Sequence, residues 1–192
     1  MKEYIIATNN KHKVEEISQA LGDSIKLITL KELGHKKDIP ETCDTLKGNA
    51  QQKAQYIYKK FEKDCFADDT GLEVEALNGE PGVYSARYAG ERCSFEDNID
   101  KLLEEMDGKT NRKASFTTVI CLIEDGKEYF FEGTCKGSIT TERYGKKGFG
   151  YDPIFIPDGY GESFAEMNLD EKNKISHRGL AVEKLVKHIL KK

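Results

Sequence analysis

The sequence contains no apolar run near the length of a membrane-spanning helix, for which about 18 consecutive apolar residues are needed. The apolar run closest to the amino terminus, Tyr4–Ala7, is also too short for the core of a secretory signal peptide. We therefore expect a cytoplasmic protein that does not interact with membranes.

A basic excess is also missing. The chain carries 30 Lys and Arg residues against 34 Asp and Glu residues, for a formal net charge of -4. Broad binding to nucleic acids or anionic membrane surfaces requires an excess of positive charge. We expect no nucleic-acid partner, although a local basic pocket is compatible with this composition.

The cysteines form no recognisable pairs. Their number, five, is odd and none lies in a CxxC motif, so neither a disulfide framework nor a zinc site is indicated. Cys121 and Cys135 flank a probable two-residue hairpin turn at Asp125–Gly126, which would place Cys121 opposite Phe130 and Cys135 opposite Phe116. The two sulfurs would then be roughly 17 Å apart along the strands, beyond the ~7 Å limit for the Cα atoms of a disulfide. We expect free thiols.

Apolar spacing predicts alternating strands and helices in the first third of the chain. Tyr4–Ala7, Ile25–Leu30 and Cys65–Ala67 are predicted strands, separated by a helix that ends at Gly22 and a longer helix capped by Asp44 or Thr45. This β-α-β-α-β order requires an at least partly parallel sheet.

The remainder of the chain has a different pattern. We expect a helix from Ser94 to Gly108, a long hairpin of Lys113–Ile123 and Lys127–Ile139, and a final helix capped by Ser176. The antiparallel hairpin favours a mixed sheet or a second lobe. A chain of 192 residues fits one domain, or one domain with a small lobe.

The segment Phe66–Leu72 interrupts an apolar run with two adjacent carboxylates, Asp68 and Asp69, followed by Thr70. In open α/β sheets ligands bind beyond the carboxyl ends of strands, so this pair could hold a metal ion. The same residue types are common in turns, which leaves a solvated turn as the alternative. If the strand remains extended, the two side chains point to opposite faces and should have different roles.

Two polar groups earlier in the chain could act on the same ligand. Thr8–Lys13 joins a strand to a helix, where backbone N–H groups attract phosphate; the alternative is a capped helix with surface lysines. Glu41 could share Mg²⁺ with Asp69, with Asn49 and Lys53 one helical turn apart on the next helix, unless Glu41 is simply exposed. No GxxxxGK[ST] pattern occurs, so P-loop chemistry has no support.

Two later groups could bind a planar ring. Lys147–Pro153 sets Phe149 and Tyr151 among glycines and ends in Asp152, which is typical either of a base pocket or of a Gly-rich loop with aromatic side chains in the core. Lys172–Arg178 is cationic at an expected helix start, against the helix dipole. An anionic or carbonyl-rich ligand would explain those charges.

Together these residues resemble the inosine triphosphate pyrophosphatase family, whose members hydrolyse ITP, dITP and XTP to the nucleoside monophosphate and pyrophosphate. The resemblance extends over almost the whole chain and rests on seven ordered blocks: Ala7-Thr8-x-Asn10-x-x-Lys13, Glu41-Thr42, Asn49-Ala50-x-x-Lys53-Ala54, Ala67-Asp68-Asp69-Thr70-Gly71-Leu72, Gly79-x-Pro81-Gly82-x-Tyr84-Ser85-Ala86-Arg87-Tyr88, Gly148-Phe149-Gly150-Tyr151-Asp152-Pro153 and Ser176-His177-Arg178. Many members carry Ser where this chain has Thr70, and both residues offer a hydroxyl.

The resemblance implies a single α/β domain over residues 1–192, with an elongated mixed sheet and flanking helices in two lobes around a central cleft. It also implies a cytoplasmic homodimeric hydrolase that requires Mg²⁺. Glu41 and Asp69 would hold the metal, Asp69 would be the proton acceptor, and Lys53 would act with it. The implied substrate-binding residues are Thr8, Asn9, Asn10, Lys11, His12, Lys13, Thr70, Phe149, Gly150, Tyr151, Asp152, Lys172, His177 and Arg178.

Two other functions remain alternatives. A Maf-like pyrophosphatase would prefer pyrimidine or modified nucleotides, whereas the Ser176–Arg178 block favours purines. A non-catalytic nucleotide sensor would retain the base pocket but would not need the carboxylates of Glu41 and Asp69.

Overall fold

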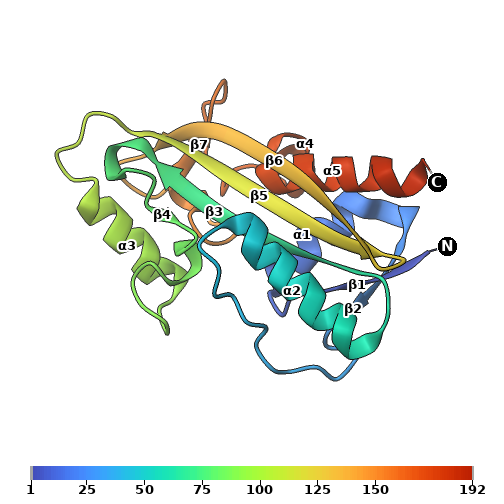
Figure 1. The fold of residues 1–192 in the computed structure, drawn as a ribbon. Helices are drawn as coiled ribbons and strands as arrows, with labels where there is room; N and C mark the ends of the chain where they lie inside the picture. The colour runs from blue at the N-terminus through green and yellow to red at the C-terminus, as the bar shows by residue number, and fades with distance from the viewer. Residues whose placement is uncertain (1, 192) are drawn as a thin grey trace. The chain divides into compact units, whose positions relative to one another are not determined.

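The computed structural model describes residues 2–191 of the chain; Met1 and Lys192 lie outside the described residues. It has a mixed α/β architecture in which helices cover the faces of one sheet (Figure 1). The α/β class predicted from the sequence is therefore confirmed. The strands and helices are β1 (Glu3–Ile6), α1 (Lys11–Leu21), β2 (Lys26–Thr29), α2 (Leu46–Phe61), β3 (Cys65–Val74), β4 (Pro81–Gly82), α3 (Phe95–Glu105), β5 (Lys113–Glu124), β6 (Lys127–Ile139), β7 (Phe155–Pro157), α4 (Leu169–Ile175) and α5 (His177–Leu190).

The sheet has the order β2-β1-β3-β5-β6-β7, and β4 pairs with β3. β1 is parallel to both β2 and β3, with Ile5 opposite Cys65 and Ile6 opposite Phe66. β4 and β7 are antiparallel to their neighbours, so the sheet is mixed as expected. The hairpin turn between β5 and β6 has positive φ at both Asp125 and Gly126, as a two-residue turn with the favoured twist requires.

The chain divides into two compact units. Unit 1 comprises residues up to Asp69, Thr118–Gly133 and residues from His177 on, whereas unit 2 comprises Thr70–Thr117 and Thr134–Ser176. β3, β5 and β6 contribute residues to both units.

Side chains along a strand point alternately to its two faces, which gives unit 1 two apolar layers. Ile6 of β1 and Phe66 of β3 pack with apolar residues of α1 and α5, whereas Ile5, Cys65 and Ala67 point to the other face and pack with α2 (Figure 1). The positions of α1, α2 and α5 therefore determine which helix each side chain of β3 can reach.

Unit 2 has its own apolar core, which includes residues of β3, α3, β5 and β7. Three aromatic rings meet there: the Phe155 centroid lies 4.7 Å from that of Phe116 and 5.1 Å from that of Phe164. Ring pairs at this separation add specific packing energy to the burial of their area.

Several predicted helix ends are confirmed, and one region differs. Gly22 ends α1 with φ 52°, Thr45 rather than Asp44 caps α2, and Ser94 caps α3. The prediction of one final helix starting at Ser176 missed α4, a separate short helix capped by Asn168. No helix within residues 2–191 is both long and apolar enough to cross a membrane.

All five cysteines are free, as expected. Burial raises the pKa of Cys65 and Cys121 to about 12 and that of Cys135 to about 11, whereas Cys43 and Cys93 are partly exposed. Because the thiolate is the reactive form, we expect a thiol reagent at pH 8 to modify two cysteines in the native protein and the other three only in denaturant. Reaction of all five at one rate would contradict the described burial.

Candidate active site

Asp68 and Asp69 lie within β3, which continues to Val74 rather than ending at the acidic pair as the sequence suggested. Its parallel neighbour β1 ends at Ile6, and the last backbone contact between them runs from Ala7 N to Phe66 O at 2.8 Å. The two carboxylates thus lie just beyond the carboxyl end of β1. The extended strand directs them to opposite faces, as the alternation argument predicted.

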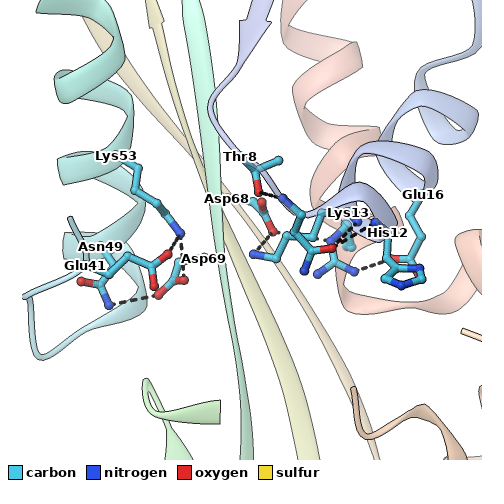
Figure 2. Close-up of polar contacts among 11 residues, drawn as sticks. Thr8, His12, Lys13, Glu16, Glu41, Asn49, Lys53, Asp68 and Asp69 are labelled. Atoms are coloured by element: carbon cyan, nitrogen blue, oxygen red, sulfur yellow. Dashed lines mark hydrogen bonds and ion pairs between the residues drawn. The ribbon is translucent and has the colours of Figure 1, made fainter. Parts of the chain in front are cut away.

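Asp69 faces α2, from which two side chains reach it. Asn49 Nδ2 donates to Asp69 Oδ2 at 3.1 Å, and Lys53 Nζ lies 3.1 Å from Asp69 Oδ1. Lys53 also donates to Glu41, so both carboxylates converge on one ammonium group (Figure 2). Asn49 and Lys53 are four residues apart on α2, which places them on the same face of the helix.

Burial and three neighbouring charges act on the pKa of Asp69. Burial raises the pKa of Asp69, Lys53 and Lys13 oppose the rise, and Glu41 adds to it. Burial disfavours the charge of Lys53, but Asp69 and Glu41 outweigh it and raise the pKa of the ammonium. Two carboxylates thus meet at one buried ammonium group, and their oxygens are the type of ligand that Mg²⁺ takes.

A metal here would need additional oxygen ligands. Among the described residues, no group of three or more His, Cys, Asp and Glu side chains is arranged to hold a metal ion. Mg²⁺ commonly takes one or two carboxylates and completes its shell with waters and substrate phosphates. Glu41 and Asp69 match that pattern.

Asp68 faces α1 and α5, where its negative charge is paired with two cations. Its Oδ2 lies 2.9 Å from Lys13 Nζ (Figure 2) and 3.5 Å from Arg178 Nε, and Arg178 also donates to Glu16 of α1. Burial alone would raise the pKa of Asp68, but Lys13, Arg178 and Lys53 hold it well below its usual range. Asp68 is therefore an ionised member of a buried network, in contrast to Asp69.

The segment before α1 is organised by its own side chains. Thr8 Oγ1 accepts from Asn10 N at 3.1 Å, and Asn10 caps the helix by accepting from His12 N at 3.0 Å and Lys13 N at 3.3 Å. Asn9 Nδ2 donates to the backbone oxygen of Lys37 at 3.2 Å. The capped turn directs Lys13 to Asp68, while Lys11 and His12 are exposed.

Asp152 is the centre of a second polar group, within unit 2. Its Oδ2 accepts from Lys172 Nζ at 2.6 Å and from Phe149 N at 2.8 Å, and both charged side chains are buried. The Lys172 ammonium also lies 5.4 Å from the centroids of Phe149 and Phe164, within cation–π range. The Asp152–Lys172 pair thus carries both polar and aromatic contacts.

The other predicted substrate-binding residues have different surroundings. Tyr151 is buried in the core of unit 2 and its hydroxyl donates to Ser85 O at 2.8 Å, so burial raises its pKa. Gly150 has φ 60° and Thr70 is half-buried in β3. His177 is buried at the start of α5.

Sequence reasoning missed Glu16, although it is 4% exposed and binds the guanidinium of Arg178. Glu16 lies three residues after Lys13 and therefore on the same side of α1. In the sequence, the position of Glu16 beside the apolar residue Ile17 could have indicated that its carboxylate is buried. Arg178 was attributed to an anionic ligand, whereas Glu16 and Asp68 are anionic partners within unit 1.

Residues 4–188 match the Ham1 family. The chain belongs to this family. It is 55% identical to a dITP/XTP pyrophosphatase of Flavobacterium psychrophilum, with 95% of this chain and 96% of the relative covered. It is 53% identical to a dITP/XTP pyrophosphatase of Porphyromonas gingivalis, with 96% of each covered.

Solved structures of Ham1 proteins share this fold. The Ham1 protein of Staphylococcus aureus is 41% identical and superposes with a TM-score of 0.88 over 99% of each chain. The HAM1 protein of Coxiella burnetii is 39% identical, with a TM-score of 0.91 over 100% of each chain. The family resemblance inferred from the seven sequence blocks is therefore confirmed.

Proposed function

We propose that this chain is a hydrolase that converts dITP, XTP and ITP to the nucleoside monophosphate and pyrophosphate, and so removes aberrant purine nucleotides from the nucleotide pool. The observation that carries the proposal is the convergence of Glu41 and Asp69 on Lys53, in a chain 55% identical to a dITP/XTP pyrophosphatase. This arrangement supplies anionic oxygens for a metal and a cation for phosphate.

The cofactor we propose is Mg²⁺, held by Glu41 and Asp69. The convergence of both carboxylates on Lys53 supports this assignment, because it brings two anionic oxygen ligands together. When bound, Mg²⁺ would neutralise charge on the phosphate oxygens and on the departing pyrophosphate.

The chain's own residues would then have separate tasks. Asp69 would accept the proton of the attacking water, because its carboxylate would lie beside the metal-bound substrate. Lys53 would bind phosphate oxygens beside Asp69. Thr8–Lys13 would contribute a hydroxyl, amides and cations to the triphosphate, and Thr70 would contact the substrate.

Base recognition is assigned to Phe149, Gly150, Tyr151, Asp152, Lys172, His177 and Arg178. Hypoxanthine and xanthine present a 6-oxo acceptor where adenine has an amino donor. A site built to donate to that oxygen leaves its donors unpaired with adenine, which can cost ~10⁴-fold in rate. The buried ammonium of Lys172 is a donor of the required kind.

The loop at Gly148 offers a direct test of that assignment. An added Cβ would lie 2.1 Å from Asp152 Oδ2, so Gly148→Ala should displace Asp152 from Lys172 and raise the KM for ITP about tenfold, equivalent to ~1.4 kcal/mol. Gly159→Ala is the matched control, because Gly159 also has positive φ but nothing within 4 Å. Equal KM values for the two variants would contradict the role of Asp152.

We also propose that the protein is a cytoplasmic homodimer that acts on small-molecule substrates. The five free thiols support a reducing compartment. Light scattering of the purified protein would test the dimer, for which a monomer mass is the contradicting result.

The decisive activity experiment measures pyrophosphate release from ITP, XTP, dITP, GTP, ATP and dTTP with and without Mg²⁺. We expect release from ITP, XTP and dITP in the presence of Mg²⁺ and little from ATP. A preference for dTTP would favour a Maf-like enzyme instead. No product from any triphosphate would favour a nucleotide sensor.

A further inference from the structure

We propose that Gln52 is a positioning residue for the metal-binding site: its amide clamps Thr42 and thereby fixes the neighbouring carboxylate of Glu41 opposite Asp69. The inference rests on the proposed function of Glu41 and Asp69 as metal ligands. Gln52 itself would contact neither the metal nor the substrate. It acts through the backbone that carries Glu41.

Glu41 lies in a segment that has little local structure of its own. Residues 30–45, between β2 and α2, contain neither helix nor strand. Connections of this length are uncommon in compact domains unless they are functional or held by side-chain contacts. Contacts from outside the segment are therefore needed to hold Glu41 in one position.

Gln52 makes two hydrogen bonds to a single residue of this segment, one with its backbone and one with its side chain. Its Oε1 accepts from Thr42 N at 2.9 Å, and its Nε2 donates to Thr42 Oγ1 at 2.9 Å. An amide that uses both its acceptor and its donor on one residue fixes distance and orientation together. Thr42 directly follows Glu41, so the clamp restrains the carboxylate-bearing residue through one peptide unit.

Asn49 extends the restraint to the second carboxylate. Cys43 N donates to Asn49 Oδ1 at 2.9 Å, and Asn49 Nδ2 donates to Asp69 Oδ2 at 3.1 Å. Asn49 and Gln52 are three residues apart on α2 and share a face of the helix. One helical turn thus connects the segment of Glu41 to Asp69 of β3.

The expected consequence concerns metal affinity. Outer-sphere partners that orient metal-ligating side chains typically contribute 10–100-fold to metal affinity. Without the clamp, the contact with Lys53 and the metal itself must order Glu41. We therefore expect Gln52→Leu to weaken metal binding about tenfold, while turnover at saturating Mg²⁺ stays near the wild-type value.

The test uses two readouts on the chain of 192 residues. Mn²⁺ alone, titrated by electron paramagnetic resonance, gives the metal dissociation constant without substrate, and amide hydrogen exchange reports the Thr42 N–H. Gln51→Leu is the matched control, because Gln51 is an adjacent, half-buried glutamine whose amide donates to Glu128 at 2.6 Å. Thr42→Ser should retain the clamp, whereas Thr42→Val should lose its hydroxyl contact.

The inference predicts that Gln52→Leu raises the Mn²⁺ dissociation constant about tenfold and accelerates exchange of the Thr42 amide, with Gln51→Leu and Thr42→Ser unchanged in both readouts. A Mn²⁺ dissociation constant for Gln52→Leu within twofold of the wild-type value would overturn it. Failure of the proposed function is a separate result: the wild-type protein would bind Mn²⁺ yet release no pyrophosphate from any triphosphate.

Discussion

Replacement of Asp69 by Asn should remove nearly all pyrophosphate release from ITP, at least ~10³-fold, because one group provides both the proton acceptor and a metal ligand. The variant should nevertheless be as stable as the wild-type protein or more so. The raised pKa of Asp69 means that folding disfavours the charged carboxylate relative to the neutral carboxyl, and Asn supplies a neutral group of the same shape. Urea unfolding and a Mg²⁺-dependent pyrophosphate assay measure the two quantities.

Asp68→Asn is the matched control, since it makes the same change at the adjacent residue. Asp68 is ionised between Lys13 and Arg178, so loss of its charge should destabilise the fold by about 3–5 kcal/mol but leave measurable turnover in the folded protein. The lowered pKa of Asp68 contributes stability above about pH 3.9, and this contribution is lost as the pH falls toward its folded value. As the pH falls, the free energies of unfolding of Asp68→Asn and Asp69→Asn should therefore approach that of the wild-type protein. Equal losses of turnover would contradict the separation of roles.

Replacement of Arg178 by Met should cause a large loss of stability. Arg178 is 2% exposed and pairs with Glu16 and Asp68, so its removal leaves two buried carboxylates without their guanidinium partner. Breaking a buried ion pair from one side costs about 3–5 kcal/mol. Urea unfolding at pH 7 should show a correspondingly lower midpoint.

Arg143→Met provides the comparison for that variant. Arg143 also contacts two carboxylates, Glu96 and Asp100, but its side chain is 35% exposed and theirs are more exposed still. Such surface pairs contribute about 0–1 kcal/mol. A shift for Arg178→Met no larger than that for Arg143→Met would refute the buried network.

The periodic elements of this fold could be predicted from the sequence because local signals determine them. Gly22 ends α1 in a left-handed conformation, and the Asp125–Gly126 turn sets the β5–β6 hairpin. Short elements were missed for the opposite reason. α4 has seven residues, too few for an apolar periodicity to emerge.

The predicted end of β3 was wrong because the residue types favour a turn there, whereas the backbone remains extended. Asp69, Thr70 and Gly71 are common in turns, yet the strand continues through them to Val74. Tertiary contacts override that preference: Asp69 binds Asn49 and Lys53 of α2, far away in sequence. The strand or turn propensity of a residue does not include contacts with such distant partners.

Within the candidate site, the split between the two aspartates could be predicted, whereas their partners could not. Strand alternation alone assigned Asp68 and Asp69 to opposite faces. Identifying Glu16 as the partner of Arg178 required the packing of α1 against α5, which no local pattern encodes. The clamp of Gln52 on Thr42 likewise joins a loop to a helix. In the sequence, Gln52 cannot be told apart from an ordinary polar residue on the surface of a helix.

The most direct test of the proposed reaction is the hydrolysis of ITP by the wild-type protein with Mg²⁺ in ¹⁸O-labelled water, followed by mass spectrometry of the products. Attack of water on the α-phosphorus predicts ¹⁸O in inosine monophosphate and none in pyrophosphate. Formation of inosine diphosphate and phosphate, or of labelled pyrophosphate, would contradict the account.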